Sequence, residues 1–74
     1  MEVTIGVANL PRELTVEVDL STAQVRELLE DALARDGLFI LTDARGREVA
    51  VPAKALGYVE IGPEAARKVG FGSL

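Results

Sequence analysis

Residues 14–37 have the sequence LTVEVDLSTAQVRELLEDALARDG, in which a strand pattern is followed by a helix pattern and a glycine. Apolar and polar residues alternate in its first part, which is typical of a strand with one buried face. The later apolar residues recur at spacings of three and four, which places them along one side of an α-helix: Val25, Leu28, Leu29, Ala32 and Leu33. The sequence therefore predicts a strand that leads into an amphipathic helix.

The predicted helix has signals at both ends. Ser21 is the expected N-cap, and Gln24 three residues later can complete a capping box. At the other end, we expect Gly37 to adopt the left-handed conformation that ends many helices. The helix is thus predicted to lie between Ser21 and Gly37.

The segment before the helix is predicted to form a β-hairpin. Apolar and polar residues alternate at 2–7 and again at 13–18, which indicates two half-buried strands. The intervening residues 8–12 contain Asn9 and Pro11, both of which favour turns.

The segment after the helix is predicted to add further strands. Residues 38–42, LFILT, are apolar at four of five positions, so we expect a strand buried on both faces. Residues 43–46 match a type I turn, with Asp first and Gly fourth. Residues 48–51 and 57–61 are predicted as the next two strands. The order ββαβββ predicts a two-layer α+β fold, with one amphipathic helix packed on a single mixed sheet.

Length and composition limit the classes of protein that this chain can form. Its 74 residues suffice for one domain, residues 1–74, in which 69–74 form a flexible tail unless Phe71 packs on the core. The net charge of −4 argues against nucleic-acid binding, which depends on basic residues. The absence of cysteine, of a signal-peptide pattern and of a long apolar run predicts a cytoplasmic protein that does not bind membranes.

The segments MEVTIGV, ELTVEVD and STAQVRELLEDAL have the spacing of a hairpin followed by a helix. In this respect residues 1–35 resemble a β-grasp domain, the ubiquitin-like fold. Ubiquitin-like modifiers and sulfur carriers end in Gly-Gly, whereas this chain ends in GFGSL. The resemblance therefore implies the fold and not the chemistry of those proteins.

Three segments resemble a second family in the same order along the chain: MEVTIGVANLPRELTVE, LTDARGREVAVPAKALGYVEIG and RKVGFG. This family consists of short, uncharacterised actinobacterial proteins that are classed as a domain of unknown function. The resemblance implies a bacterial cytoplasmic setting, and it implies no activity and no site residues.

Leu38, Ile40 and Tyr58 are the candidates for an exposed apolar sheet face. If Phe39 and Leu41 face the helix, Leu38 and Ile40 must face the opposite side of the sheet. A partner protein or a second copy of the chain could cover that side, and so could the C-terminal segment of the same chain. The sequence favours neither alternative.

A second group of candidates lies near the C-terminus, where cations and glycines flank an aromatic residue. Such a segment suits either a docking peptide or an ordinary tail: Arg67, Lys68, Gly70, Phe71 and Gly72. Arg45 and Arg47 form a small basic hairpin tip that could bind an anion, or could simply keep the turn soluble.

The sequence contains no histidine and no cysteine, and the carboxylates Glu13, Glu17 and Asp19 are expected to face water. We therefore predict no catalytic, metal or cofactor site. The favoured function is a non-enzymatic module that binds a protein partner or forms a homo-oligomer, such as a dimer. The alternative is binding of an anionic metabolite or nucleotide by Arg45, Arg47, Arg67 and Lys68.

Overall fold

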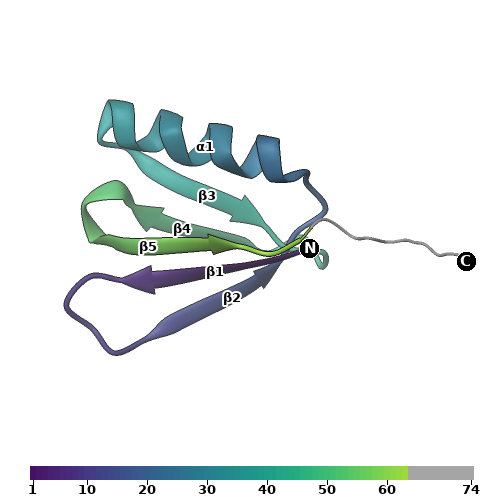
Figure 1. The fold of residues 1–74 in the computed structure, drawn as a ribbon, viewed down its shortest axis with the longest axis horizontal. Coiled ribbons are helices and arrows are strands. Elements are labelled where there is room, and N and C mark those ends of the chain that lie inside the picture. The colour runs from purple at the N-terminus through teal and green to yellow at the C-terminus, as the bar shows by residue number, and fades with distance from the viewer. Residues whose placement is uncertain (64–74) are drawn as a thin grey trace, which may run out of the picture.

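The structure, a computed structural model, describes residues 1–63. It contains one α-helix, one short 3₁₀ helix and five strands: β1 (Glu2–Val7), β2 (Glu13–Glu17), α1 (Thr22–Arg35), β3 (Leu38–Thr42), β4 (Glu48–Pro52), η1 (Ala53–Ala55) and β5 (Leu56–Ile61). Figure 1 shows the helix on one side of the strands. The predicted ββαβββ order and the α+β class are confirmed.

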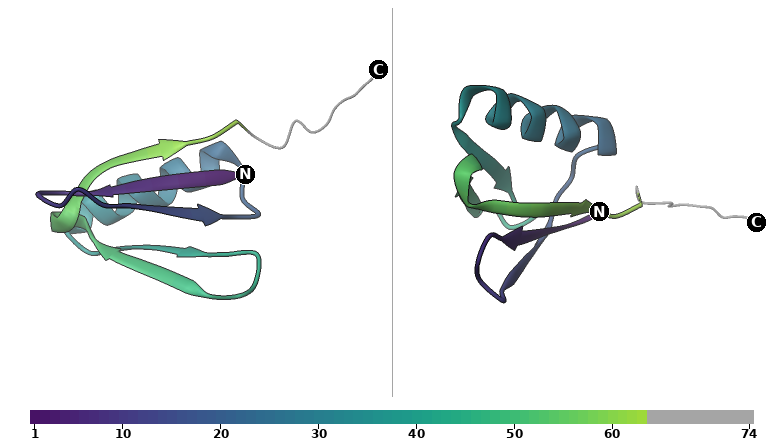
Figure 2. Two further views of the ribbon diagram at one scale, coloured as in Figure 1. Left: turned by 90° about the horizontal axis from the view of Figure 1, so that it is seen from below. Right: turned by 60° about the vertical axis from the view of Figure 1, so that its left-hand side comes forward.

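The strands form two separate hydrogen-bonded sheets, where the sequence analysis expected a single mixed sheet. One sheet has the order β2-β1-β5 and the other consists of β3 and β4. All three strand pairs are antiparallel, because each connection along the chain reverses its direction. The left view of Figure 2 shows the β3–β4 hairpin beside the three-stranded sheet, next to β2.

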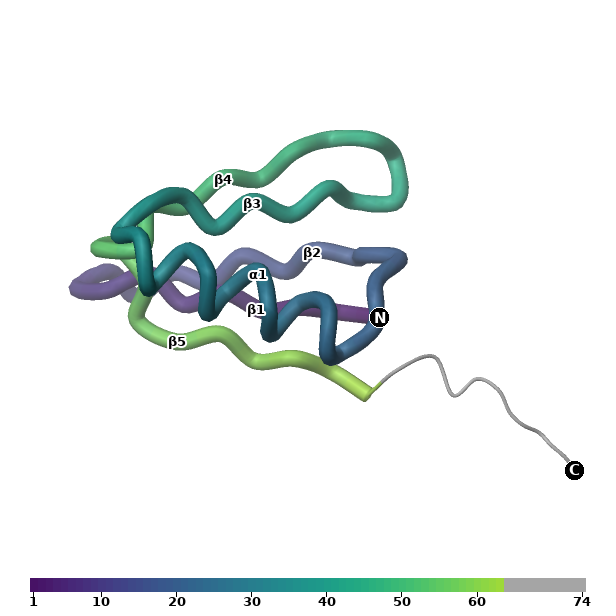
Figure 3. The backbone as a smooth tube through the Cα atoms, turned by 90° about the horizontal axis from the view of Figure 1, so that it is seen from above, coloured from purple at the N-terminus to yellow at the C-terminus, as the bar shows by residue number. Residues whose placement is uncertain are grey.

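The two sheets and the helix enclose one core. Its fully buried side chains come from every major element except β5, whose apolar residues are partly buried against it: Val3, Ile5, Val16, Val18, Val25, Ala32, Phe39, Leu41 and Val51. In Figure 3 the helix lies across the middle of the molecule, with β3 on one side and β5 on the other. Removal of this apolar surface from water is the main stabilising contribution to the fold.

The helix begins as predicted, and its C-cap lies one residue before the predicted glycine. Ser21 accepts a hydrogen bond from the backbone N–H of Gln24 at 3.1 Å, and the Gln24 side chain accepts one from the N–H of Ser21 at 2.9 Å. The left-handed residue is Asp36, with φ of 52°, and not Gly37. The N–H of Gly37 donates to the carbonyl of Ala32, so the cap closes with the left-handed residue one position before the glycine.

The apolar stripe of the helix is only partly buried. Val25 and Ala32 lie in the core, whereas Leu28 and Leu33 are 41% and 55% exposed. These two leucines lie on opposite flanks of the stripe, where the helix surface turns away from the strands.

The prediction that β3 is buried on both faces was wrong. Phe39 and Leu41 point into the core, but Leu38 and Ile40 are exposed. The reason is that β3 belongs to a two-stranded sheet, and no element within residues 1–63 covers the outer face of that sheet. In the same range, the single helix is too short and too polar to cross a lipid bilayer.

Candidate functional site

The outer side of the β3–β4 hairpin presents apolar side chains to solvent. Leu38 lies opposite Pro52, and Ile40 lies opposite Ala50. All four are exposed, with Leu38 at 53% and Ile40 at 39%. We call these four residues the hairpin face.

The apolar surface continues from the hairpin face onto the helix. Ile40 of β3 and Leu28 of α1 line the same shallow hollow of about 390 Å³, together with Leu20. Polar residues also line this hollow, namely Asp19, Thr42 and Asp43. Solvent-exposed leucine and isoleucine from two elements therefore meet in one place, where a partner could bury them together.

Tyr58 does not belong to this surface. It lies on β5, directly opposite Gly6 of β1, on the outer face of the three-stranded sheet. Its hydroxyl donates a hydrogen bond to Oε2 of Glu13 on β2. This bond to a carboxylate, with the negative charge of Glu13, raises the pKa of Tyr58. The expected grouping of Tyr58 with Leu38 and Ile40 is therefore wrong, because the two sheets are separate.

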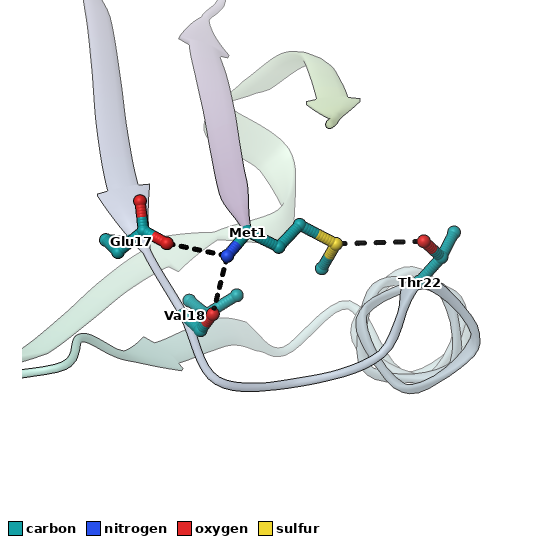
Figure 4. Close-up of polar contacts among 4 residues, drawn as sticks. All are labelled: Met1, Glu17, Val18 and Thr22. Atoms are coloured by element: carbon teal, nitrogen blue, oxygen red, sulfur yellow. Dashed lines mark hydrogen bonds and ion pairs between the residues drawn. The ribbon is translucent and has the colours of Figure 1, made fainter. Parts of the chain in front are cut away.

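The outer face of the three-stranded sheet is otherwise polar and acidic. The strand register places Glu2 opposite Glu17, and Thr4 between Thr15 and Glu60. The like charges of Glu2 and Glu17 are relieved in part by the α-amino group of Met1, which lies 2.6 Å from Glu17 Oε2 and also donates to the Val18 carbonyl at 3.2 Å (Figure 4).

The side chain of Met1 anchors the same end of β1. Its sulfur accepts a hydrogen bond from the Thr22 hydroxyl at 3.7 Å, and its side chain is 2% exposed (Figure 4). Glu13, Glu17 and Asp19 are exposed, as the sequence predicted.

Arg45 and Arg47 lie at the tip of the β3–β4 hairpin, where Asp43 organises the turn. The Asp43 carboxylate accepts hydrogen bonds from the backbone N–H groups of Arg45 and Arg47 and from Nε of Arg47, at 2.8–2.9 Å. These bonds, above all that of the Arg47 side chain, hold the pKa of Asp43 below its usual value. The positive charge of Arg47 is thus balanced by the Asp43 carboxylate within the same turn.

A cleft of about 390 Å³ separates the hairpin tip from the edge of β2. Arg45 and Arg47 line it on one side, and Thr15 and Glu17 on the other. The backbone N–H of Ala44 donates to the carbonyl of Glu17 at 3.0 Å across one end of the cleft. Two carboxylates, from Asp43 and Glu17, therefore lie beside the two guanidinium groups.

The C-terminal candidates lie outside the described residues: Arg67, Lys68, Gly70, Phe71 and Gly72. Their roles as a docking tail, or as anion ligands together with Arg45 and Arg47, stay predictions. Among residues 1–63, no three aspartate or glutamate side chains lie close enough to hold a metal ion.

Comparison with protein families gives a match over nearly the whole chain. A family model with the description "Protein of unknown function (DUF3107)" matches residues 1–72. The chain belongs to the DUF3107 family. No curated protein matches it in a sequence comparison. The description of the DUF3107 family names no ligand, partner or reaction, so the geometry above is the basis for a functional argument.

Sequence reasoning missed one feature of this DUF3107 domain, a groove beside Tyr58. Its lining includes Leu10 of the β1–β2 loop and Glu13 of β2. The pairing of Gly6 with Glu13 could have been inferred from the hairpin pattern. Both residues lie on the side of their strands that faces away from the apolar residues, and they flank the same loop. The position of Tyr58 beside Gly6 could not, because it depends on the pairing of β5 with β1.

Proposed function

We propose that the protein is a non-enzymatic interaction module, which binds a protein partner or a second copy of itself through the hairpin face and Leu28. The observation that carries this proposal is the exposure of Leu38 and Ile40 on a strand whose other two apolar side chains, Phe39 and Leu41, are fully buried. A contiguous exposed apolar surface with a polar border often marks a protein contact.

Burial of this surface by a binding partner would be energetically favourable. Full burial of a leucine or isoleucine side chain stabilises a complex by about 1.5–3 kcal/mol relative to full exposure. Leu28, Leu38 and Ile40 are 41%, 53% and 39% exposed, so each has part of this free energy still to gain.

We further propose a bacterial cytoplasmic setting, and an actinobacterial origin. The absence of cysteine supports a reducing compartment, and the sequence resemblance described above supports the origin. The hairpin–helix order supports a relationship to ubiquitin-like domains, although the Gly-Gly terminus of their modifiers is not found in this sequence.

The first test is the molar mass by light scattering of the wild type and of a Leu38→Lys/Ile40→Lys variant. We expect a wild-type dimer that this variant splits into monomers with unchanged helical circular dichroism. The matched control is Thr15→Lys/Ala34→Lys, which adds the same two charges at exposed positions elsewhere and should remain dimeric.

If the wild type is a monomer, the proposal requires a different protein on this face. Immobilised wild type should then retain a specific partner from a bacterial lysate, and the Leu38→Lys/Ile40→Lys variant should not. A monomer that retains no specific partner would show that the proposal is wrong.

The alternative function, binding of an anionic metabolite or nucleotide, has one supporting observation. Arg45 and Arg47 line the same cleft. Against it, Asp43 already pairs with Arg47 at 2.8 Å. Titration with inorganic phosphate should shift the amide resonances of both arginines, and Arg45→Gln should abolish the shift. An absence of shifts in the wild type would exclude this alternative.

A further inference from the structure

Tyr58 lies flat against β1 in a way that only glycine at position 6 permits. A Cβ atom on Gly6 would lie 2.1–2.5 Å from three carbons of the Tyr58 ring. The ring therefore covers Gly6 with one face, and Tyr58 remains 48% exposed. The hydrogen bond to Glu13 fixes the hydroxyl end of the ring.

Tyr58 borders a groove of about 590 Å³ whose lining also includes Gly6 and Val7 of β1, and we call it the Tyr58 groove. Leu10 and Pro11 of the β1–β2 loop form its apolar part, and Arg12 and Glu13 form its polar part. Leu10 is 57% exposed, the highest value among the large apolar side chains of residues 1–63. The groove thus combines an aromatic face, an exposed leucine and a carboxylate.

The groove lining carries one cation, Arg12, and one carboxylate, Glu13, and further carboxylates lie on the same sheet face. Glu60 lies on the same sheet face two residues beyond Tyr58, and Glu2 and Glu17 lie further along it. Arg12 is the cation of the groove lining itself, and the whole chain carries a net charge of −4. Such a surface attracts a positively charged group more strongly than a neutral or acidic one.

We propose that the Tyr58 groove docks a basic, extended segment of a partner protein, with an arginine side chain on the Tyr58 ring. A guanidinium group stacks on an aromatic face and is attracted by its quadrupole. Oε2 of Glu13 accepts the Tyr58 hydroxyl, which leaves Oε1 to accept an N–H of the arginine. An apolar residue next to the arginine would pack on Leu10.

This surface is independent of the hairpin face, since the two lie on different sheets. The two proposals can therefore fail separately. The Tyr58 groove would select a basic partner by charge, whereas the hairpin face would bind by burial of apolar area.

The chain itself supplies the probe for a test. Tyr58 is the only tyrosine and the sequence has no tryptophan, so intrinsic tyrosine fluorescence reports on this groove alone. The ligand in the experiment is the blocked peptide LRLRL, and its control is the same peptide with citrulline in place of both arginines. Citrulline keeps the shape of arginine and removes its charge.

We expect the LRLRL peptide to change the Tyr58 fluorescence in a saturable manner, and the citrulline peptide to have no effect. Glu13→Gln should weaken binding of LRLRL about tenfold, the change expected from loss of one charge-assisted hydrogen bond. Tyr58→Leu, measured by calorimetry, should weaken it by a similar factor. Leu38→Ser/Ile40→Ser, which alters only the hairpin face, should bind like the wild type.

The matched control for charge is Glu27→Gln, which removes an equal charge from the exposed surface of the helix. If Glu27→Gln weakens binding as much as Glu13→Gln, the attraction is diffuse and the proposal is wrong. Equal binding of the citrulline peptide, loss of binding in Leu38→Ser/Ile40→Ser, or no saturable signal would also overturn it. Amide shifts centred on Gly6 and Leu10 would support it, and unchanged circular dichroism would show that each variant is folded.

Discussion

Gly6 and Tyr58 illustrate how a single residue without a side chain organises one face of the molecule. Gly6 has no left-handed backbone, so its requirement for glycine comes from packing and not from φ. The space that a Cβ would occupy is taken by the Tyr58 ring. The Tyr58 hydroxyl in turn donates a hydrogen bond to Glu13 of β2. The contacts of Gly6, Tyr58 and Glu13 therefore join β1, β5 and β2.

The double-mutant cycle of Gly6→Ala and Tyr58→Ala tests this packing. In the wild type, Gly6→Ala should lower the free energy of unfolding by about 1–2 kcal/mol, because the ring must move away. In the Tyr58→Ala background the same change should be neutral or stabilising by about 0.5 kcal/mol, because alanine restricts the unfolded chain. Urea denaturation followed by circular dichroism measures both. Equal effects in the two backgrounds would show that the contact contributes nothing.

The ionisation of Tyr58 provides a second test at this scale. A raised pKa means that the protonated hydroxyl is favoured in the folded state. The associated stability is therefore present below the unfolded pKa near 10 and is lost as the pH rises through the folded pKa. Because Tyr58 is the only tyrosine, the ultraviolet absorbance of tyrosinate measures its pKa directly.

We expect this absorbance titration to give a pKa above 10 in the wild type. Glu13→Gln removes the charge that causes the shift and should return the pKa toward 10. Glu27→Gln serves as the control and should leave the pKa unchanged. A wild-type pKa equal to that of Glu13→Gln would contradict the hydrogen bond.

At the scale of the elements, the helix is specified mostly by local sequence. The capping box of Ser21 and Gln24 satisfies two backbone donors that a helix start leaves unpaired. The burial of Val25 and Ala32 then fixes which side faces the strands. Local signals and core packing therefore agree along this segment.

Ser21→Ala should lower the free energy of unfolding by about 1 kcal/mol, since the N–H of Gln24 loses its acceptor. Ser21→Gly should cost only a few tenths of a kcal/mol, because glycine also suits the N-cap position. Thermal or urea unfolding of the two variants measures the difference. A loss in Ser21→Ala no larger than that in Ser21→Gly would show that the cap has little effect.

At the scale of the whole fold, the main feature of residues 1–63 is the division of their five strands into two sheets. The β3–β4 hairpin contacts β2 through the hydrogen bond from Ala44 N to Glu17 O. After β4, the chain passes through η1 into β5, which pairs with β1. Between these points, the cleft beside Arg45 and Arg47 separates the two sheets. The hairpin is thus held by core packing and by few backbone bonds to the remaining sheet.

Ala44→Pro tests this arrangement, because it removes the N–H that bonds to Glu17 while proline suits the second position of a type I turn. We expect the free energy of unfolding to fall by about 0.5–1.5 kcal/mol. Hydrogen exchange should accelerate at the amides of β3 and β4 more than at those of β1. Ala44→Ser keeps the N–H and should match the wild type. Uniform acceleration in all strands would indicate that the two sheets open as one unit.

Most of the fold could be predicted from sequence because its signals are local. The alternation at residues 2–7 and 13–18, the helix spacing and the turn at 43–46 each depend on near neighbours in the chain. The hydrogen bond from Gly46 N to Asp43 O confirms that turn. The end of the helix was the local exception, since Asp36 and Gly37 are both able to close a helix and only the backbone shows which one does.

The sequence by itself determined the order of elements, the apolar side of β1 and β2 and the cap at Ser21, because these follow from residue spacing and side-chain chemistry. Only the tertiary structure decided that β5 pairs with β1 and that β3–β4 forms a separate sheet. Strand pairing joins residues far apart in the chain, and alternation alone does not specify the partner. That pairing exposes Leu38 and Ile40, and it brings Tyr58 to Gly6 and Glu13.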